Sequence, residues 1–312
     1  MASATTAFTP RRARDPAALG PDDPLIPRLL LGRRLRELRA DGSWTRARAA
    51  EAAGCAPSTI TRVEQGRTAV GHGVLTALLD LYGVHDDAER ATLHTLADQT
   101  HARPWWYDHR DAVPRDRGRY LSAERAGRLV RCYSDRYLPE LLRTAAYARA
   151  LARHERPPSG DRHLELLARR QRILRRRPRP VNLWVVLDET VLWRPVGDAA
   201  TMRAQLEHLV EMSWRPNVTV QIARYDVCRR VAADGPLTLI RFPQQNLPDL
   251  VALDRDGRTA YPVRPAEIER HWHIFNTLVI EAAPPEHTPG IVKDALADYR
   301  MREIRHRVQA AP

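Results

Sequence analysis

The run WTRARAAEAAGCAPSTITRVEQG, residues 44–66, constrains the fold of this chain more than any other feature. Its small and apolar residues recur at helical spacing on both sides of Gly54, and Gly66 ends the second segment. A tight turn between helices needs a residue that accepts a positive φ, which glycine does at no steric cost. The pattern therefore predicts two short helices packed together through Ala50, Ile60 and Val63.

If these helices pack through those positions, the second one turns a polar row outward. In a helix-turn-helix, such a row enters the major groove of DNA and meets the edges of the bases. We therefore predict base contacts from Ser58, Thr59, Thr61 and Arg62.

Phosphate contacts are expected on either side of this row. Thr45 and Arg46 begin the preceding helix, where free backbone N–H groups favour an anion. Arg67 follows the second helix and is predicted to bind a second phosphate.

The two helices are part of a longer helical region. Residues 1–24 show no periodicity and are predicted to form a disordered arm. From residue 25 to residue 100, apolar positions and glycine stops predict five short helices in one small all-α domain.

This region resembles the XRE (Cro/C1-type) helix-turn-helix family. The matching residues are LGRRLRELR at 31–39, Thr45, the small pair Ala49 and Ala50, Gly54, and STITRVEQG at 58–66. The resemblance implies a DNA-binding regulator that binds a pseudo-palindromic operator as a dimer. Ala56 stands where the family commonly has the capping residue Ser or Thr, and Pro57 at the first helical position partly offsets that loss.

The rest of the chain has a different pattern. Residues 101–119 are predicted to be a linker, and residues 120–312 a larger mixed α/β domain. Helices are predicted over 122–132, 139–154, 160–176, 198–212, 265–282 and 290–307. Strands are predicted over 182–190, 218–222 and 237–242, with 250–253 as a fourth.

Several blocks of this second region also resemble a known family. They are YLPELLRTAAYARAL at 137–151, RRQRIL at 169–174, VVLDETVLWRPVG at 185–197, MRAQLEHL at 202–209 and NVTVQIARYD at 217–226. Together they are similar to an actinobacterial domain of unknown function that follows XRE segments in antitoxin-like transcriptional regulators. The resemblance implies a small partner protein encoded nearby. Arg143 stands where that family usually has glutamine.

Asp188 and Glu189 are the best candidates for an effector site in the second domain. They end a predicted buried strand, which is where α/β folds often place a ligand. The competing interpretation is a helix cap or an ion pair with Arg194. His271 and His273 point in opposite directions on a predicted helix, so we expect no shared metal there.

Composition narrows the class of protein. The net charge is +12, which suits a polyanion such as nucleic acid, although arginine use of this kind also arises in GC-rich genomes. The N-terminus lacks the apolar segment of a secretory signal, and no apolar run is long enough to span a membrane. We expect a cytoplasmic protein, not an enzyme, with no cofactor, because no nucleotide, metalloprotease or hydrolase motif is present.

Three functions remain open from sequence alone. The first is a sequence-specific transcriptional regulator with a C-terminal domain for dimerisation, ligand sensing or docking of a small protein. The second is an enzyme or small-molecule sensor that the helix-turn-helix only localises to DNA. The third is a protein-binding antitoxin whose DNA binding is autoregulatory.

Overall fold

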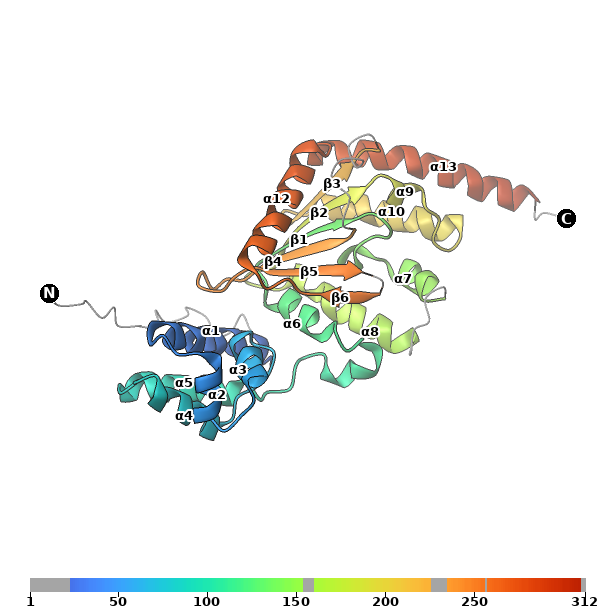
Figure 1. Cartoon of the computed structure of the whole chain (residues 1–312). Helices are drawn as coiled ribbons and strands as arrows, with labels where there is room; N and C mark the ends of the chain where they lie inside the picture. Colours follow the sequence, from blue (N-terminus) through green and yellow to red (C-terminus); the bar gives the residue numbers. More distant parts are fainter. Residues whose placement is uncertain (1–22, 154–159, 226–234, 256, 310–312) are drawn as a thin grey trace. The chain divides into compact units, whose positions relative to one another are not determined.

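The computed structural model describes residues 23–153, 160–225, 235–255 and 257–309. The chain divides into two compact units (Figure 1). The first contains the N-terminal residues through Tyr107 together with Gln244–Leu247, and the second contains the rest.

The first unit is all-helical, as predicted. Its five helices are α1 (Leu25–Asp41), α2 (Arg46–Ala52), α3 (Pro57–Glu64), α4 (His72–Leu81) and α5 (Asp87–Gln99). Leu31, Leu35, Ile60, Leu75 and Leu93 are among the side chains that form its core, and each is at most 2 % exposed. This core fixes α3 through its inward side and leaves its other side to solvent.

The turns of this unit form where the glycines predict them. Gly54 and Gly66 have φ values of 61° and 63°, a backbone conformation that residues with a Cβ rarely adopt. The Thr45 Oγ1 accepts a hydrogen bond from the Arg48 backbone N–H at 3.1 Å and so caps α2. Ala56 gives α3 no side-chain cap, and Pro57 occupies its first turn.

The second unit is built on one six-stranded mixed sheet. Its spatial order is β3-β2-β1-β4-β5-β6, with β1, β2 and β3 parallel and the other neighbours antiparallel. The strands are β1 (Leu129–Ser134), β2 (Asn182–Asp188), β3 (Val218–Ala223), β4 (Leu237–Arg241), β5 (Leu250–Arg255) and β6 (Arg258–Ala260).

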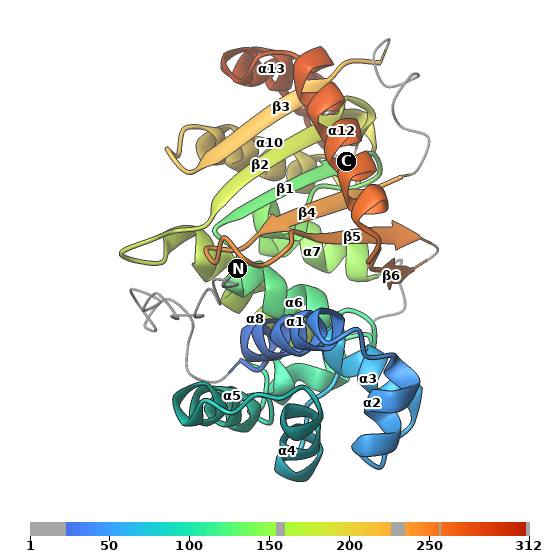
Figure 2. The same ribbon diagram turned by 60° about the vertical axis from the view of Figure 1, so that its left-hand side comes forward.

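Helices cover both faces of this sheet (Figure 2). One face packs on α12 through Tyr133, Val186, Leu239 and Phe275. The opposite face carries α6, α7, α8 and α10. The α-helices described in this unit are α6 (Gly118–Ala126), α7 (Ala145–Ala152), α8 (Gly160–Gln171), α9 (Thr190–Trp193), α10 (Ala199–Ser213), α12 (Pro265–Glu281) and α13 (Thr288–Gln309).

The main error of the sequence prediction is at β1. A single helix was expected over 122–132, but α6 ends at Ala126 and residues 129–134 form a central strand. Gly127 lies between them, and a Cβ there would come within 2.8 Å of the Ile240 Cγ2. The periodicity of α6 continues into a short apolar run, and such a run is ambiguous between helix and strand.

Smaller differences concern boundaries. The expected helix over 139–154 is instead a short 3₁₀ turn, η3 (Glu140–Leu142), followed by α7. The side chain of Thr144 caps the N-terminus of α7. The expected linker over 101–119 contains the 3₁₀ segment η2 (Tyr107–Ala112) and the start of α6. The β6 strand was not expected.

Candidate functional site

The predicted base-reading row lies on the outer side of α3. Ile60 and Val63 are 2 % and 4 % exposed and face the core. Ser58 and Arg62 are exposed, and Thr59 and Thr61 are partly exposed. The α3 helix therefore presents the four predicted residues on the side that its core contacts leave uncovered.

Two hydrogen bonds organise this row. The Arg62 Nη2 donates to the Thr59 Oγ1 at 3.2 Å, one helical turn earlier. The Thr61 Oγ1 donates to the Pro57 carbonyl oxygen at 3.2 Å. Both bonds are long and exposed, so the side chains can exchange them for base edges at little cost.

Two of the three predicted phosphate contacts also have partners inside the unit. Thr45 caps α2, and Arg46 donates from its Nε to the Glu64 Oε2 at 3.2 Å. Within the described residues, no further hydrogen bond engages the Nη groups of Arg46, which leaves them able to bind a phosphate. Arg67 is exposed just beyond α3.

Glu64 is a residue that the sequence reasoning missed. Its side chain is 3 % exposed, and it accepts hydrogen bonds from Arg39 at 2.5 Å and from Arg46. Arg39 also donates to the Trp44 carbonyl oxygen at 2.9 Å, and its hydrogen bond with Glu64 raises the pKa of the guanidinium. A buried glutamate at the end of α3 thus joins α1, the α1–α2 turn and the start of α2. The sequence signal was available, since a glutamate in a short helix just before its glycine stop needs a partner once buried.

Asp188 and Glu189 lie at the end of β2, where they fix local structure. The Asp188 Oδ1 accepts from the Thr190 backbone N–H at 2.8 Å, a local contact two residues ahead at the start of α9. The Glu189 Oε2 accepts from the Tyr225 backbone N–H at 3.2 Å and lies 3.7 Å from the Arg224 Nε. The sequence suggested Arg194 as the ion-pair partner at this site. In the structure, Glu189 pairs with Arg224 instead.

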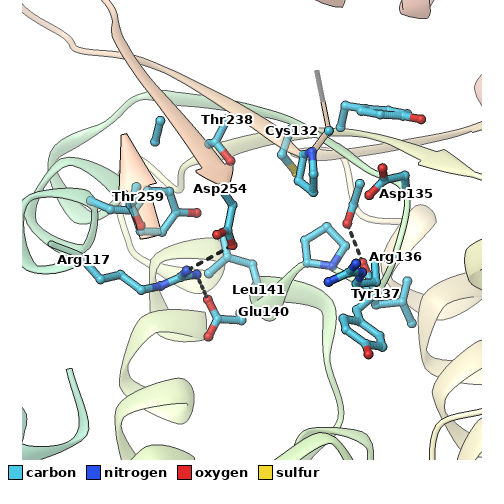
Figure 3. Close-up of a pocket in the computed structure, with 18 of the residues that line it drawn as sticks. Arg117, Cys132, Asp135, Arg136, Tyr137, Glu140, Leu141, Thr238, Asp254 and Thr259 are labelled. Atoms are coloured by element: carbon cyan, nitrogen blue, oxygen red, sulfur yellow. Dashed lines mark hydrogen bonds and ion pairs between the residues drawn. The ribbon is translucent and has the colours of Figure 1, made fainter. Parts of the chain in front are cut away.

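A cavity of about 770 Å³ lies elsewhere in the second unit (Figure 3). Its floor is a row across the sheet, because Cys132 of β1 pairs with Thr238 of β4 and Thr238 pairs with Ala252 of β5. Its other walls come from the start of α6 and from residues 134–143. Asp188 and Glu189 are not among its lining residues, although Tyr133, which lines it, donates a long 3.5 Å hydrogen bond to the Asp188 Oδ2.

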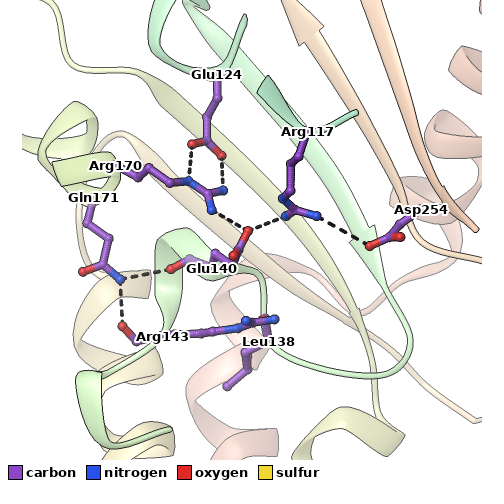
Figure 4. Close-up of polar contacts among 8 residues, drawn as sticks. All are labelled: Arg117, Glu124, Leu138, Glu140, Arg143, Arg170, Gln171 and Asp254. Atoms are coloured by element: carbon purple, nitrogen blue, oxygen red, sulfur yellow. Dashed lines mark hydrogen bonds and ion pairs between the residues drawn. The ribbon is translucent and has the colours of Figure 1, made fainter. Parts of the chain in front are cut away.

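A buried ionic network adjoins this cavity, and its members Arg117, Glu140 and Asp254 line the cavity (Figure 4). Arg170 donates to both carboxylate oxygens of Glu124, at 2.8 and 2.9 Å, and lies 2.5 Å from Glu140. Arg117 also pairs with Glu140, and its Nη1 lies 3.7 Å from the Asp254 Oδ2. Arg170 belongs to the arginine-rich run over 169–180, and its side chain is 3 % exposed.

Burial and charge act in opposite directions within this network. Burial raises the pKa of the Glu140 carboxyl, but the guanidinium groups of Arg117 and Arg170 outweigh it and hold that pKa well below its usual range. Glu140 is therefore a permanent anion at neutral pH.

The described residues contain no candidate metal site and no membrane-spanning helix. In that part of the chain, no group of three His, Cys, Asp or Glu side chains is placed to hold a metal ion. None of the helices described there has the length and apolar content needed to cross a membrane.

Comparisons with known proteins match both parts of the chain. Residues 30–93 match the model of a helix-turn-helix domain, and residues 117–294 match the model of a domain of unknown function, DUF5753. Neither the curated proteins nor the solved structures gave a significant match. The second model spans more than half of the 312 residues. The chain is therefore a DNA-binding regulator that belongs to the DUF5753 family and carries its helix-turn-helix ahead of the family domain.

Proposed function

We propose that this protein is a sequence-specific transcriptional regulator of the XRE type, in which α3 reads the bases of an operator. The observation that carries the proposal is the two-sided character of α3. Ile60 and Val63 fix one side to the core, while Ser58 and Arg62 are exposed on the other. A rigid inner side and a free polar outer side are what major-groove reading requires.

Phosphate contacts would set the register of α3 on the duplex. Arg46 and Arg67 lie on the segments before and after α3, and both are exposed. Contacts of this kind fix orientation without carrying sequence information. The Glu64 anchor holds Arg46 near the start of α2, where backbone N–H groups also favour a phosphate.

We further propose that the regulator binds a pseudo-palindromic operator as a homodimer in the cytoplasm. Two-fold symmetry of the protein would then be matched by two half-sites about one helical turn apart, roughly 34 Å. The DUF5753 domain would supply the dimer contact or dock a small protein encoded nearby, as the antitoxin-like resemblance suggests. We propose no catalytic activity for it.

Genome-wide footprinting with the purified full chain tests the DNA-binding part of this proposal. The expected result is a set of sites with two related half-sites. A double variant, Ser58→Ala with Arg62→Ala, should lose these sites while it keeps salt-dependent binding to random DNA. Protection of the same sites by wild type and by the variant would rule out base reading by α3.

The cavity favours a second candidate function, that of a ligand sensor. Pockets that hold small molecules have volumes of about 300–1,000 Å³, and this one falls within that range. An effector that alters operator affinity must itself bind more tightly or more weakly, by the same factor, when operator is present. Calorimetric titration of an effector, or of the small partner protein, with and without operator DNA tests this linkage. Equal affinities in the two titrations would leave the domain with a scaffolding role only.

A further inference from the structure

Arg143 is a half-buried cation in the lining of the cavity. Its Nε donates to the Leu138 carbonyl oxygen at 2.6 Å. Within the described residues, no carboxylate lies within ion-pair distance of its guanidinium, and no other hydrogen bond of that group is present. The side chain is half-buried and lines the cavity.

The charges buried around Arg143 do not cancel. Three guanidinium groups, of Arg117, Arg143 and Arg170, share only two buried carboxylates, of Glu124 and Glu140. Asp254 lies 3.7 Å from Arg117, but its side chain is 49 % exposed and water screens it. Within this buried cluster one positive charge is in excess, and the remaining charged residues of the cavity lining, Asp116, Asp135, Arg136 and Arg255, add equal numbers of both signs.

The pKa of the Arg143 guanidinium agrees with this excess of positive charge in the buried cluster. Burial lowers the pKa of its guanidinium, and the attraction of Glu140 does not restore it. Burying a cation without a partner is costly, so the charge reduces the stability of the empty domain. Charged groups with a strongly perturbed pKa in a cleft are common at ligand-binding sites.

The remaining lining defines the kind of molecule that would fit. The floor offers the Thr238 hydroxyl and the small side chains of Cys132 and Ala252. Tyr120 offers an aromatic ring at one wall, and Arg117 stacks over it at 5.1 Å. The cavity lining thus includes both the Arg143 guanidinium and an uncharged floor.

We propose that the cavity of the DUF5753 domain is a binding site for a small organic anion, a carboxylate or a phosphate ester, whose charged group pairs with Arg143. The inference deepens the sensor function proposed above by naming the chemical class of its ligand. The Arg143 guanidinium can bind such a group with two parallel hydrogen bonds through its Nη groups. The anion would neutralise the excess charge, and its organic part would lie over the Thr238 floor.

A matched pair of fluorescent probes tests the proposal on the full chain without DNA. 8-Anilinonaphthalene-1-sulfonate carries an anionic group, and N-phenyl-1-naphthylamine has the same ring system without it. We expect the wild type to bind the anionic probe more tightly. Arg143→Gln should weaken binding of the anionic probe about tenfold, which corresponds to about 1.4 kcal/mol, and leave the affinity for the neutral probe unchanged. A carboxylate and a phosphate ester are then compared as competitors of the anionic probe.

Three control measurements separate the cavity from the rest of the basic surface. Arg169→Gln, at an exposed arginine of α8, should leave both probes unchanged. Thr238→Trp, which fills the cavity floor, should abolish binding of both. The melting temperature of Arg143→Gln should be no lower than that of wild type, because the substitution removes an uncompensated charge.

Several results would overturn the proposal. The first two are an anionic probe that binds Arg143→Gln as tightly as wild type, or that binds neither protein. The other two are a loss of anionic-probe affinity in Arg169→Gln as large as that in Arg143→Gln, and a loss of neutral-probe affinity in Arg143→Gln as large as that of the anionic probe. Because no DNA is present in these titrations, failure here leaves the footprinting result untouched. Failure of the footprinting experiment likewise leaves the probe affinities unaffected.

Discussion

Arg62 is the residue of α3 best equipped to distinguish one base pair from another. Its guanidinium can bind the O6 and N7 atoms of a guanine together, a contact that contributes about 1–3 kcal/mol of discrimination. The hydrogen bond from its Nη2 to Thr59 keeps it on the outer side of the helix before DNA binds. The serine and threonine hydroxyls beside it are less selective, because each can donate to or accept from several bases.

Replacement of Arg62 by alanine should therefore flatten base preference at one position in each half-site. In a selection from random DNA, the consensus should lose one conserved guanine and keep the others. Arg48→Ala is the matched control, because Arg48 is an exposed arginine of α2 that pairs with Glu51 at 2.7 Å. An unaltered consensus for Arg62→Ala would exclude a base contact by this residue.

Arg46 and Arg67 should act on affinity without acting on specificity. Each phosphate contact that is lost reduces the slope of log affinity against log salt by about one unit. Arg46→Ala and Arg67→Ala should both do so on specific and random DNA, whereas Arg33→Ala, at an arginine of α1 that pairs with Glu37, should not. A variant that folds normally and keeps the wild-type slope does not contact phosphate.

Single residues also show where sequence reasoning reached its limit. The outward position of the α3 row follows from helical periodicity alone, and the structure places it as predicted. The cavity could not be found that way, because Arg117, Arg143 and Asp254 lie far apart in sequence and meet only when the sheet forms. At Asp188 the sequence could not decide, because a carboxylate at the end of a strand suits a ligand and a helix cap equally well, and its role in an effector site stays a prediction.

At the level of elements, the contact between α1 and α3 depends on one glycine. A Cβ at Gly32 would collide with the Val63 carbonyl oxygen at the end of α3. The two helix backbones pack closely at this point, and this contact fixes how α3 is oriented relative to α1. The glycine at this place in the LGRRLRELR block is therefore a packing requirement, which the linear pattern does not reveal.

Gly32→Ala should destabilise the helical unit by about 1–3 kcal/mol, the usual cost of overpacking, and weaken operator binding at temperatures where the unit is still folded. Gly73→Ala is the matched control in α4, where nothing lies within 4 Å of an added Cβ. That change should stabilise the unit by about 0.4–1 kcal/mol. Thermal unfolding and operator affinity of the two variants check the contrast, and equal effects would contradict it.

The network between α6, η3 and α8 predicts a dependence of stability on pH. The pKa of Glu140 in the folded chain lies well below its ordinary value of 4.5, so its ion pairs contribute fully above that value. The contribution is lost as the pH falls below 4.5 and through the folded pKa. Glu140→Gln should therefore be less stable than wild type at neutral pH, and this difference should shrink in acid. Denaturant midpoints over a pH series measure it, with the exposed Glu211→Gln as control; a difference that stays constant would contradict the prediction.

The error at β1 has a cause at the same level. The strand is central, yet its alternation is incomplete, because both Cys132 and Tyr133 are buried, one on each face of the sheet. A strand covered on both faces loses the two-residue pattern that identifies half-exposed strands. β2 was predicted because its short apolar run contains β-branched residues. Pairing with β2 and β4, which local sequence does not encode, decides the conformation of residues 129–134.

For the whole molecule, the division into two units suggests that DNA reading and dimerisation belong to different units. In its described part, the helical unit has its own core of thirteen buried residues, and a core of its own is what a domain needs to fold alone. A single half-site gives few contacts, so one such unit should bind DNA weakly. Tight and specific binding then needs two readers held together, and the larger unit is the part available to hold them.

A fragment that ends at Tyr107 should therefore stay helical, sediment as a monomer and bind a single half-site weakly, while the full chain sediments as a dimer and protects both half-sites. The reason is that the contacts of the two half-sites add when the two readers are linked. Two linked readers occupy two half-sites, and the second binds at the high effective concentration that the dimer imposes. Sedimentation equilibrium of both proteins, with footprints of each on the same operator, checks the prediction. A dimeric fragment would move the dimer contact into the helical unit, and a monomeric full chain would remove the basis for two-fold operator recognition.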